Sequence, residues 1–152
     1  MTILRRSLFA WVFALAACTH AQPDPQASAQ ADAHLATFST VLKGDQEVPP
    51  AATLGQGQLD AVLDRNTRQL RWKLRYSGLT GPALSGHFHG PAQPGSNAGV
   101  VLPLPSPLSS PAEGSAQLTE AQAADLLAGR WYVNLHTAAH PGGEIRGQLT
   151  LR

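Results

Sequence analysis

Residues 70–76 have the sequence LRWKLRY, in which large apolar side chains alternate with cations without a break. Successive side chains of an extended strand point to opposite faces, so this pattern gives one apolar face and one charged face. Such a strand is typical of an antiparallel sheet that has its core on one side and water on the other. We interpret the cations Arg71, Lys73 and Arg75 as a solvated face, with an anion-binding stripe as the alternative.

The sequence on both sides of this stretch has similar strand and turn chemistry. Further strands are predicted at residues 37–42, 57–63, 84–89, 100–104, 131–136 and 144–151, between turns rich in Gly and Pro. Prolines exclude residues 103–111 from a central strand. One short helix is predicted after Thr119, which forms a capping-box pattern with Gln122, and Gly129 ends it. About seven to eight antiparallel strands with one helix predict an all-β fold, a Greek-key sandwich or barrel.

Composition limits the chain to one modest domain without a polyanionic partner. The sequence has 152 residues, of which 14% are charged, and a formal net charge of +1. A chain of this size supports one core once a leader and a tether are set aside. Because the charges nearly balance, we expect no nucleic-acid partner.

The N-terminus has the features of an export signal. Two arginines precede an apolar run at residues 8–17 that is too short to span a bilayer as a helix. The run ends in LAAC, which resembles the bacterial lipobox, so residues 1–17 are predicted to be a lipoprotein signal peptide and Cys18 the lipidated residue. The alternative is an ordinary signal with an incidental cysteine. Lipid chains on Cys18 would anchor the protein to the cell envelope, and Thr19 indicates the outer membrane if the host is Gram-negative.

Residues 18–36 are predicted to form a flexible tether, because they contain almost no large apolar side chain. The domain then spans residues 37–152. Cys18 is the only cysteine, so no intrachain disulfide can support this domain and it must fold by burial alone.

Four motifs resemble those of the CHRD (chordin-type) domain family. They are GDQEVPP at residues 44–50, GHFHGP at 86–91, WYVNLHT at 131–137 and PGGEIRG at 141–147. Their order and spacing match, and the resemblance covers residues 37–152. It implies a β-rich extracytoplasmic module without an established activity for its bacterial members. Chordin's cysteine-rich modules have no counterpart here, so its growth-factor antagonism is not carried over.

Histidines within these motifs are candidate metal ligands. On a strand, His87 and His89 project from one face, and His136 projects from a second strand together with Tyr132 and Asn134. His140, in the following turn, is a candidate fourth ligand. Imidazoles on adjacent strands suit zinc, copper or nickel.

Asn134, Glu144 and Arg146 are expected either to orient the metal ligands from behind or to serve the fold alone. In the second interpretation the histidines hydrogen-bond loop carbonyls, and Glu144 forms an ion pair with Arg146.

The motif set excludes several enzyme classes. There is no Gly-x-Ser-x-Gly and no phosphate-binding Gly-rich loop. A dinuclear centre like that of copper/zinc superoxide dismutase needs more than the four histidines of residues 37–152. No catalytic residue is therefore assigned.

Two hypotheses remain. The first is a non-enzymatic, envelope-anchored binding or structural module with an envelope or extracellular protein partner, which would expose an aromatic patch from Trp72, Trp131 or Tyr132. The alternative is a mononuclear metal-binding protein, distantly similar to superoxide dismutase, with one Cu or Zn ion at the histidines.

Overall fold

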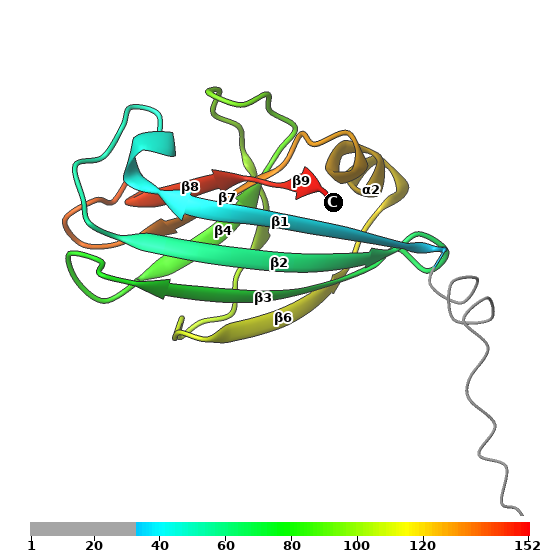
Figure 1. Cartoon of the computed structure of the whole chain (residues 1–152), viewed down its shortest axis with the longest axis horizontal. Helices are drawn as coiled ribbons and strands as arrows, with labels where there is room; N and C mark the ends of the chain where they lie inside the picture. Colours follow the sequence, from blue (N-terminus) through cyan, green and yellow to red (C-terminus); the bar gives the residue numbers. More distant parts are fainter. Residues whose placement is uncertain (1–32) are drawn as a thin grey trace, which may run out of the picture.

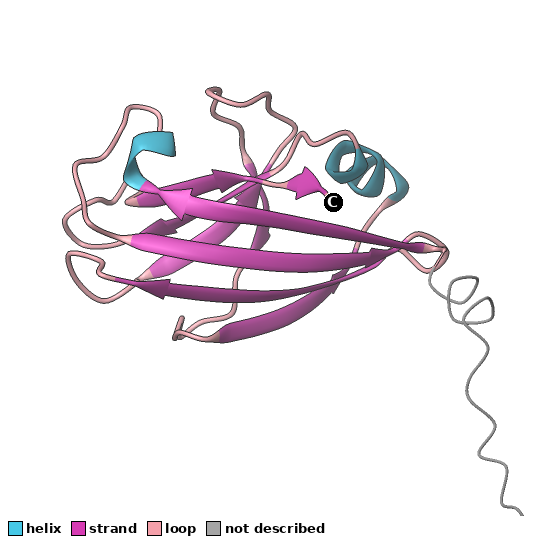
Figure 2. Cartoon of the chain, in the orientation of Figure 1, coloured by secondary structure: helices cyan, strands magenta, loops and turns pink. Residues whose placement is uncertain are grey.

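The computed structural model describes residues 33–152, and the predicted leader, Cys18 and most of the tether lie outside the described residues. A single curled sheet forms the body of the domain (Figure 1). Its strands are β1 (Leu35–Lys43), β2 (Gln56–Asp64), β3 (Gln69–Ser77), β4 (Ser85–His89), β5 (Val100–Pro103), β6 (Ala112–Gln117), β7 (Tyr132–His136), β8 (Ile145–Gln148) and β9 (Thr150–Leu151). The helical segments are η1 (Gly44–Gln46) and α2 (Glu120–Leu127), as Figure 2 shows.

The strands follow the order β5-β4-β7-β8-β1-β2-β3-β6, with β9 beside β1, and every pairing is antiparallel. The curl brings distant strands into contact across the core. Trp72 of β3 and Phe88 of β4 stand far apart in this order, yet their ring centroids are 5.2 Å apart in an edge-to-face contact. The prediction of an all-β antiparallel fold with one short helix is confirmed, and the sheet has the form of a half-barrel.

Strict alternation explains the long strands β1, β2 and β3, which run side by side in Figure 1. In β3, Leu70, Trp72 and Leu74 are buried, while the cations between them face away from the core. The predicted solvated face is therefore present, and Lys73 uses it for an exposed ion pair with Glu113 of β6.

Strand β6 was not predicted, because small residues replace the usual apolar alternation. Gly114 pairs directly with Trp72, and a Cβ at Gly114 would collide with the indole. The small residues of β6 thus leave room for the large side chain of β3. Because β6 lies at the edge of the sheet, it also needs fewer β-branched residues than a central strand.

Helix α2 begins as predicted. The Thr119 side chain accepts from the Gln122 backbone N–H, the Gln122 side chain accepts from the Thr119 backbone N–H, and Gly129 follows with φ of +69°. Leu126 packs into the core from this helix. Within residues 33–152, no helix is long and apolar enough to cross a membrane.

Two strands differ from the prediction by more than one residue at an end. Strand β1 begins at Leu35, so the last two residues assigned to the tether pair with β2. The predicted strand at residues 144–151 is interrupted at Leu149, whose backbone N–H donates to the Trp131 carbonyl while its side chain is fully buried. The interruption lets β8 pair with β7 and lets β9 pair with β1.

Candidate metal centre

Three histidines meet on the outer face of β4 and β7. Ring nitrogens of His87, His89 and His136 all lie within 4.8 Å of one another. His87 Nδ1 is 3.1 Å from His136 Nε2. Alternation explains the arrangement, since Phe88, between the two β4 histidines, is fully buried on the inner face.

The strand register completes the cluster. Ser85 pairs with His136 and His87 pairs with Asn134, so side chains that share the outer face become diagonal neighbours. Gly86 lies on the inner face, where a Cβ would collide with Leu135 and Leu104. This close packing of β4 on the core fixes the backbone that carries two of the histidines.

His140 does not join the other three histidines. It lies in the turn after β7, where its backbone N–H and carbonyl hydrogen-bond to Thr137. Its ring nitrogens fall outside the group that meets within 4.8 Å. The expected fourth histidine ligand is therefore absent from the cluster in residues 33–152.

Backbone carbonyls hold two of the rings in a metal-ready orientation. His136 Nδ1 lies 3.0 Å from the Pro141 carbonyl, and His89 Nδ1 lies 2.9 Å from the Ala98 carbonyl. A carbonyl only accepts, so each Nδ1 carries the proton and a neutral ring presents a bare Nε2. Metal-binding histidines are ordinarily held in this way. The two interpretations of the histidines, as metal ligands and as partners of loop carbonyls, are thus compatible.

The electrostatics of the cluster favour neutral imidazoles. Burial lowers the pKa of His87, and the neighbouring His136 and His89 lower it further. Burial also lowers the pKa of His136, against the hydrogen bond to Pro141, which raises it. Neutral imidazole is the form that binds metal ions, so these two rings are ready to do so at pH 7.

A buried polar layer supports the histidines. The Tyr132 ring stacks on His89 at 4.7 Å between centroids, and the Arg146 guanidinium lies 3.5 Å from the Tyr132 centroid. Arg146 also donates to Asn97 Oδ1 at 2.9 Å and to the Ser96 carbonyl at 2.7 Å. It therefore fixes the loop at residues 91–99, which supplies the carbonyl that holds His89.

Glu47 is a buried acid whose importance the sequence did not reveal. Burial raises its pKa to about 7, although attraction to Arg146 and a hydrogen bond from the Asn134 side chain lower it. A Cβ at Gly143 would collide with the Glu47 carboxylate, so glycine is required there for this approach. Only the place of Glu47 in a loop before two prolines was visible in the sequence.

Glu144 is fully buried but does not pair with Arg146, so the expected ion pair is wrong for these residues. Instead, Thr53, Thr80 and Thr137 donate hydroxyl hydrogen bonds of 2.6–2.8 Å to its carboxylate, and the Thr80 N–H donates a fourth. Burial raises the pKa of Glu144, but these hydrogen bonds outweigh it and lower the pKa to about 2. The ionised Glu144 side chain therefore links the three loops that contain Thr53, Thr80 and Thr137.

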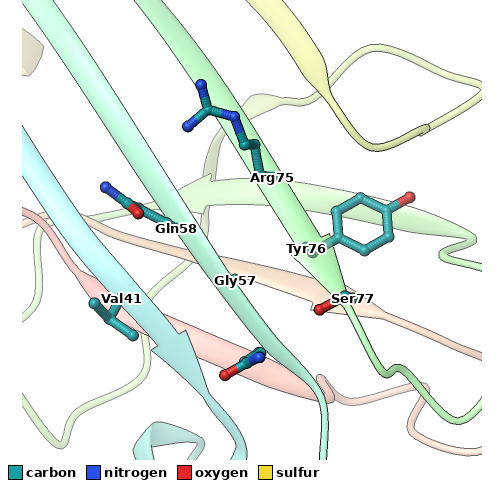
Figure 3. A pocket seen from close by; sticks show the side chains of 7 residues that line it. Val41, Gly57, Gln58, Arg75, Tyr76 and Ser77 are labelled. Carbon is teal, nitrogen blue, oxygen red and sulfur yellow. The ribbon is translucent and has the colours of Figure 1, made fainter.

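The aromatic patch predicted for a binding module does not form, since Trp72, Trp131 and Tyr132 are all buried. An open groove lies elsewhere, on the outer face of β1, β2 and β3. In Figure 3, Val41, Gln58 and Arg75 project into it from three neighbouring strands. The groove is open to solvent and separate from the histidines.

Comparison with known families agrees with the four motifs. The sequence model of the CHRD domain matches residues 38–149, which is most of the chain. The chain therefore belongs to the CHRD domain family, as the resemblance implied. Neither a curated protein nor a solved structure gives a significant match.

Proposed function

We propose that this CHRD domain is a non-enzymatic metal-binding module that takes one Zn or Cu ion at His87, His89 and His136. The convergence of their ring nitrogens within 4.8 Å carries the proposal. It favours the metal-binding alternative over a module that recognises its partner through exposed aromatic side chains.

The spacing of the nitrogens supports one ion. Zn–N bonds of about 2.0–2.1 Å put neighbouring tetrahedral ligands about 3.3 Å apart. The 3.1 Å between His87 Nδ1 and His136 Nε2 is close to that separation. Imidazole nitrogens suit both zinc and copper.

The same proposal includes export and lipid anchoring at Cys18. The lipobox-like end of the leader and the short polar tether support it. The membrane would then be one partner, and an envelope or extracellular protein would be the other. Replacing Cys18 with Ser should abolish incorporation of labelled palmitate and release the protein from the membrane fraction.

Metal binding is tested by titrating the purified protein with Zn²⁺ and with Cu²⁺ in a calorimeter, followed by elemental analysis. We expect one equivalent and a rise in melting temperature, since a ligand at 100 times its Kd stabilises the fold by about 2.7 kcal/mol. The His87→Ala/His89→Ala variant should lose both effects, whereas His140→Ala should keep them. Absence of binding by the wild type, or equal binding by the double variant, would contradict the proposal.

A further inference from the structure

One polar contact in the cluster has no hydrogen atom between its two acceptor atoms. His89 Nε2 lies 3.0 Å from Asn134 Oδ1, but the single proton of a neutral His89 ring sits on Nδ1, where it bonds the Ala98 carbonyl. Two lone pairs then face one another in a buried site. Such a contact is stable only when a cation, either a second ring proton or a metal ion, is placed against both atoms.

Turning the Asn134 amide around solves the problem only while Glu47 is protonated. Its nitrogen side faces Glu47, which accepts a hydrogen bond from the Asn134 side chain. Once Glu47 is ionised, a turned amide would place its oxygen against the carboxylate, where two acceptors would face one another. Gly143 and Arg146 confine Glu47 from other sides, so the carboxylate holds the amide oxygen toward the histidines.

We propose that Asn134 Oδ1 is the fourth protein ligand of the metal ion and that Glu47 is the residue that positions it. This inference rests on the proposed metal-binding function. Asn134 pairs with His87 in the strand register and lies two residues before His136, so all four donors come from β4 and β7.

Two donor–donor distances agree with the ligands of one ion. Ligands at about 2.0–2.1 Å from a metal are about 2.9 Å apart in a square arrangement and about 3.3 Å apart in a tetrahedral one. The His89–Asn134 separation of 3.0 Å and the His87–His136 separation of 3.1 Å both fall in that range. Each of these two pairs of donors thus has the spacing of neighbouring ligands on one ion.

The donor set limits the ion and the chemistry. Three imidazole nitrogens with one amide oxygen suit Zn²⁺, Co²⁺ and Cu²⁺, whereas Cu⁺ prefers sulfur ligands. Four protein ligands fill a tetrahedral site and leave no open position for a substrate. The site is therefore suited to holding an ion rather than to catalysis.

The test uses Co²⁺, whose visible absorption reports its ligands, and azide, which replaces a bound water but not a protein ligand. Azide should leave the spectrum of the Co²⁺-loaded wild type unchanged. In Asn134→Ala, water should take the fourth position, so azide should change the spectrum. Asn134→Asp restores an oxygen ligand and should again be insensitive to azide.

Glu47 is tested through affinity for Zn²⁺. Glu47→Leu should weaken binding about 10-fold or more, as is usual when a group behind a ligand is lost, while Glu47→Gln keeps an acceptor and should retain affinity. Equal affinities in both variants would overturn the positioning role.

Failures of the two proposals have different signatures. If the wild type binds neither Co²⁺ nor Zn²⁺, the metal-binding function fails. If metal binds and is lost in His87→Ala/His89→Ala, but azide acts equally on the wild type and Asn134→Ala, only the role of Asn134 is overturned. Circular dichroism of each metal-free variant distinguishes these outcomes from unfolding.

Discussion

The outer faces of the two halves of the sheet differ in how far their polar side chains are exposed to solvent. On β3, the cations face water, and the Lys73–Glu113 pair has side-chain exposures of 44% and 64%. On β7 and β8, Tyr132, Asn134 and Arg146 also point away from the core, yet their exposures are only 3%, 4% and 2%. Loops cover the half of the sheet that contains β7 and β8, which is called the covered half below. They leave the half that contains β3 bare.

This difference shows that the fold and the candidate site depend on different contacts. Both halves contribute apolar side chains to one core, so the fold needs no cover on the outer face. Burying polar groups costs free energy unless each is hydrogen-bonded. The covering loops supply those partners, as when Asn97 Nδ2 donates to the Val48 carbonyl at 2.9 Å and joins two of them. One of these loops, at residues 91–99, thus contacts both Arg146 and His89.

The largest effect should come from removing the cation that the covered half buries. Arg146→Met keeps the apolar stem but leaves Glu47 without its positive neighbour and frees the loop at residues 91–99. We expect a loss of about 3 kcal/mol in the free energy of unfolding, measured by urea denaturation. Arg71→Met on the bare half is the matched control and should cost less than about 0.5 kcal/mol. Similar losses in both variants would remove the distinction between the halves.

An intermediate effect should appear in the pH dependence of metal-free protein. Burial raises the pKa of Glu47 from 4.5 to about 7, so the folded state holds this proton more tightly than the unfolded chain does. The stability contributed by Glu47 is therefore full below pH 4.5 and is lost as the pH rises through 7. A pKa change from 4.5 to about 7 corresponds to about 3.4 kcal/mol, and screening of the carboxyl by solvent reduces the expected loss to about 2–3 kcal/mol.

Glu47→Gln removes this titration, so the wild type should become less stable relative to the variant between pH 4.5 and 8. Urea denaturation of both proteins in EDTA measures the difference. The lowered pKa values of His87 and His136 act in the opposite direction, since their stability is lost as the pH falls. These histidines are present in both proteins and cancel in the comparison. A stability difference that stays constant over this range would show that Glu47 is not buried as described.

The smallest effect should come from the exposed ion pair of the bare half. Lys73→Ala removes the contact with Glu113, and pairs this exposed contribute less than about 1 kcal/mol. We expect the loss to shrink further in 1 M salt, because ions screen exposed charges. A loss that is large or independent of salt would mean that the charged row has a role beyond solvation.

Much of the fold could be predicted because alternation is a local property. The pattern at residues 70–76 gave β3, and Thr119 with Gln122 gave the start of α2. Strand β6 could not be predicted, because its small residues are chosen by Trp72, which lies on another strand. Local patterns identify an element only when its own side chains form the core.

The candidate site was predictable only in part, for the same reason. The spacing of His87 and His89 places both on one strand face, but their meeting with His136 depends on the register of β4 and β7. Glu47 and Glu144 acquire their roles through loops. Thr53, which donates to Glu144, is 91 residues away in the sequence. No local pattern reports a contact at that separation.

The last strand gives the domain a property that concerns its use as a building block. Strand β9 pairs with β1, and the Arg152 backbone N–H donates to the Thr37 carbonyl at 2.9 Å, so the two ends of the domain lie side by side. A unit with adjacent ends can be inserted into a surface loop of another protein without forcing that loop apart. It also tolerates joining of its ends and reopening elsewhere. Its geometry is therefore suited to insertion into different host proteins.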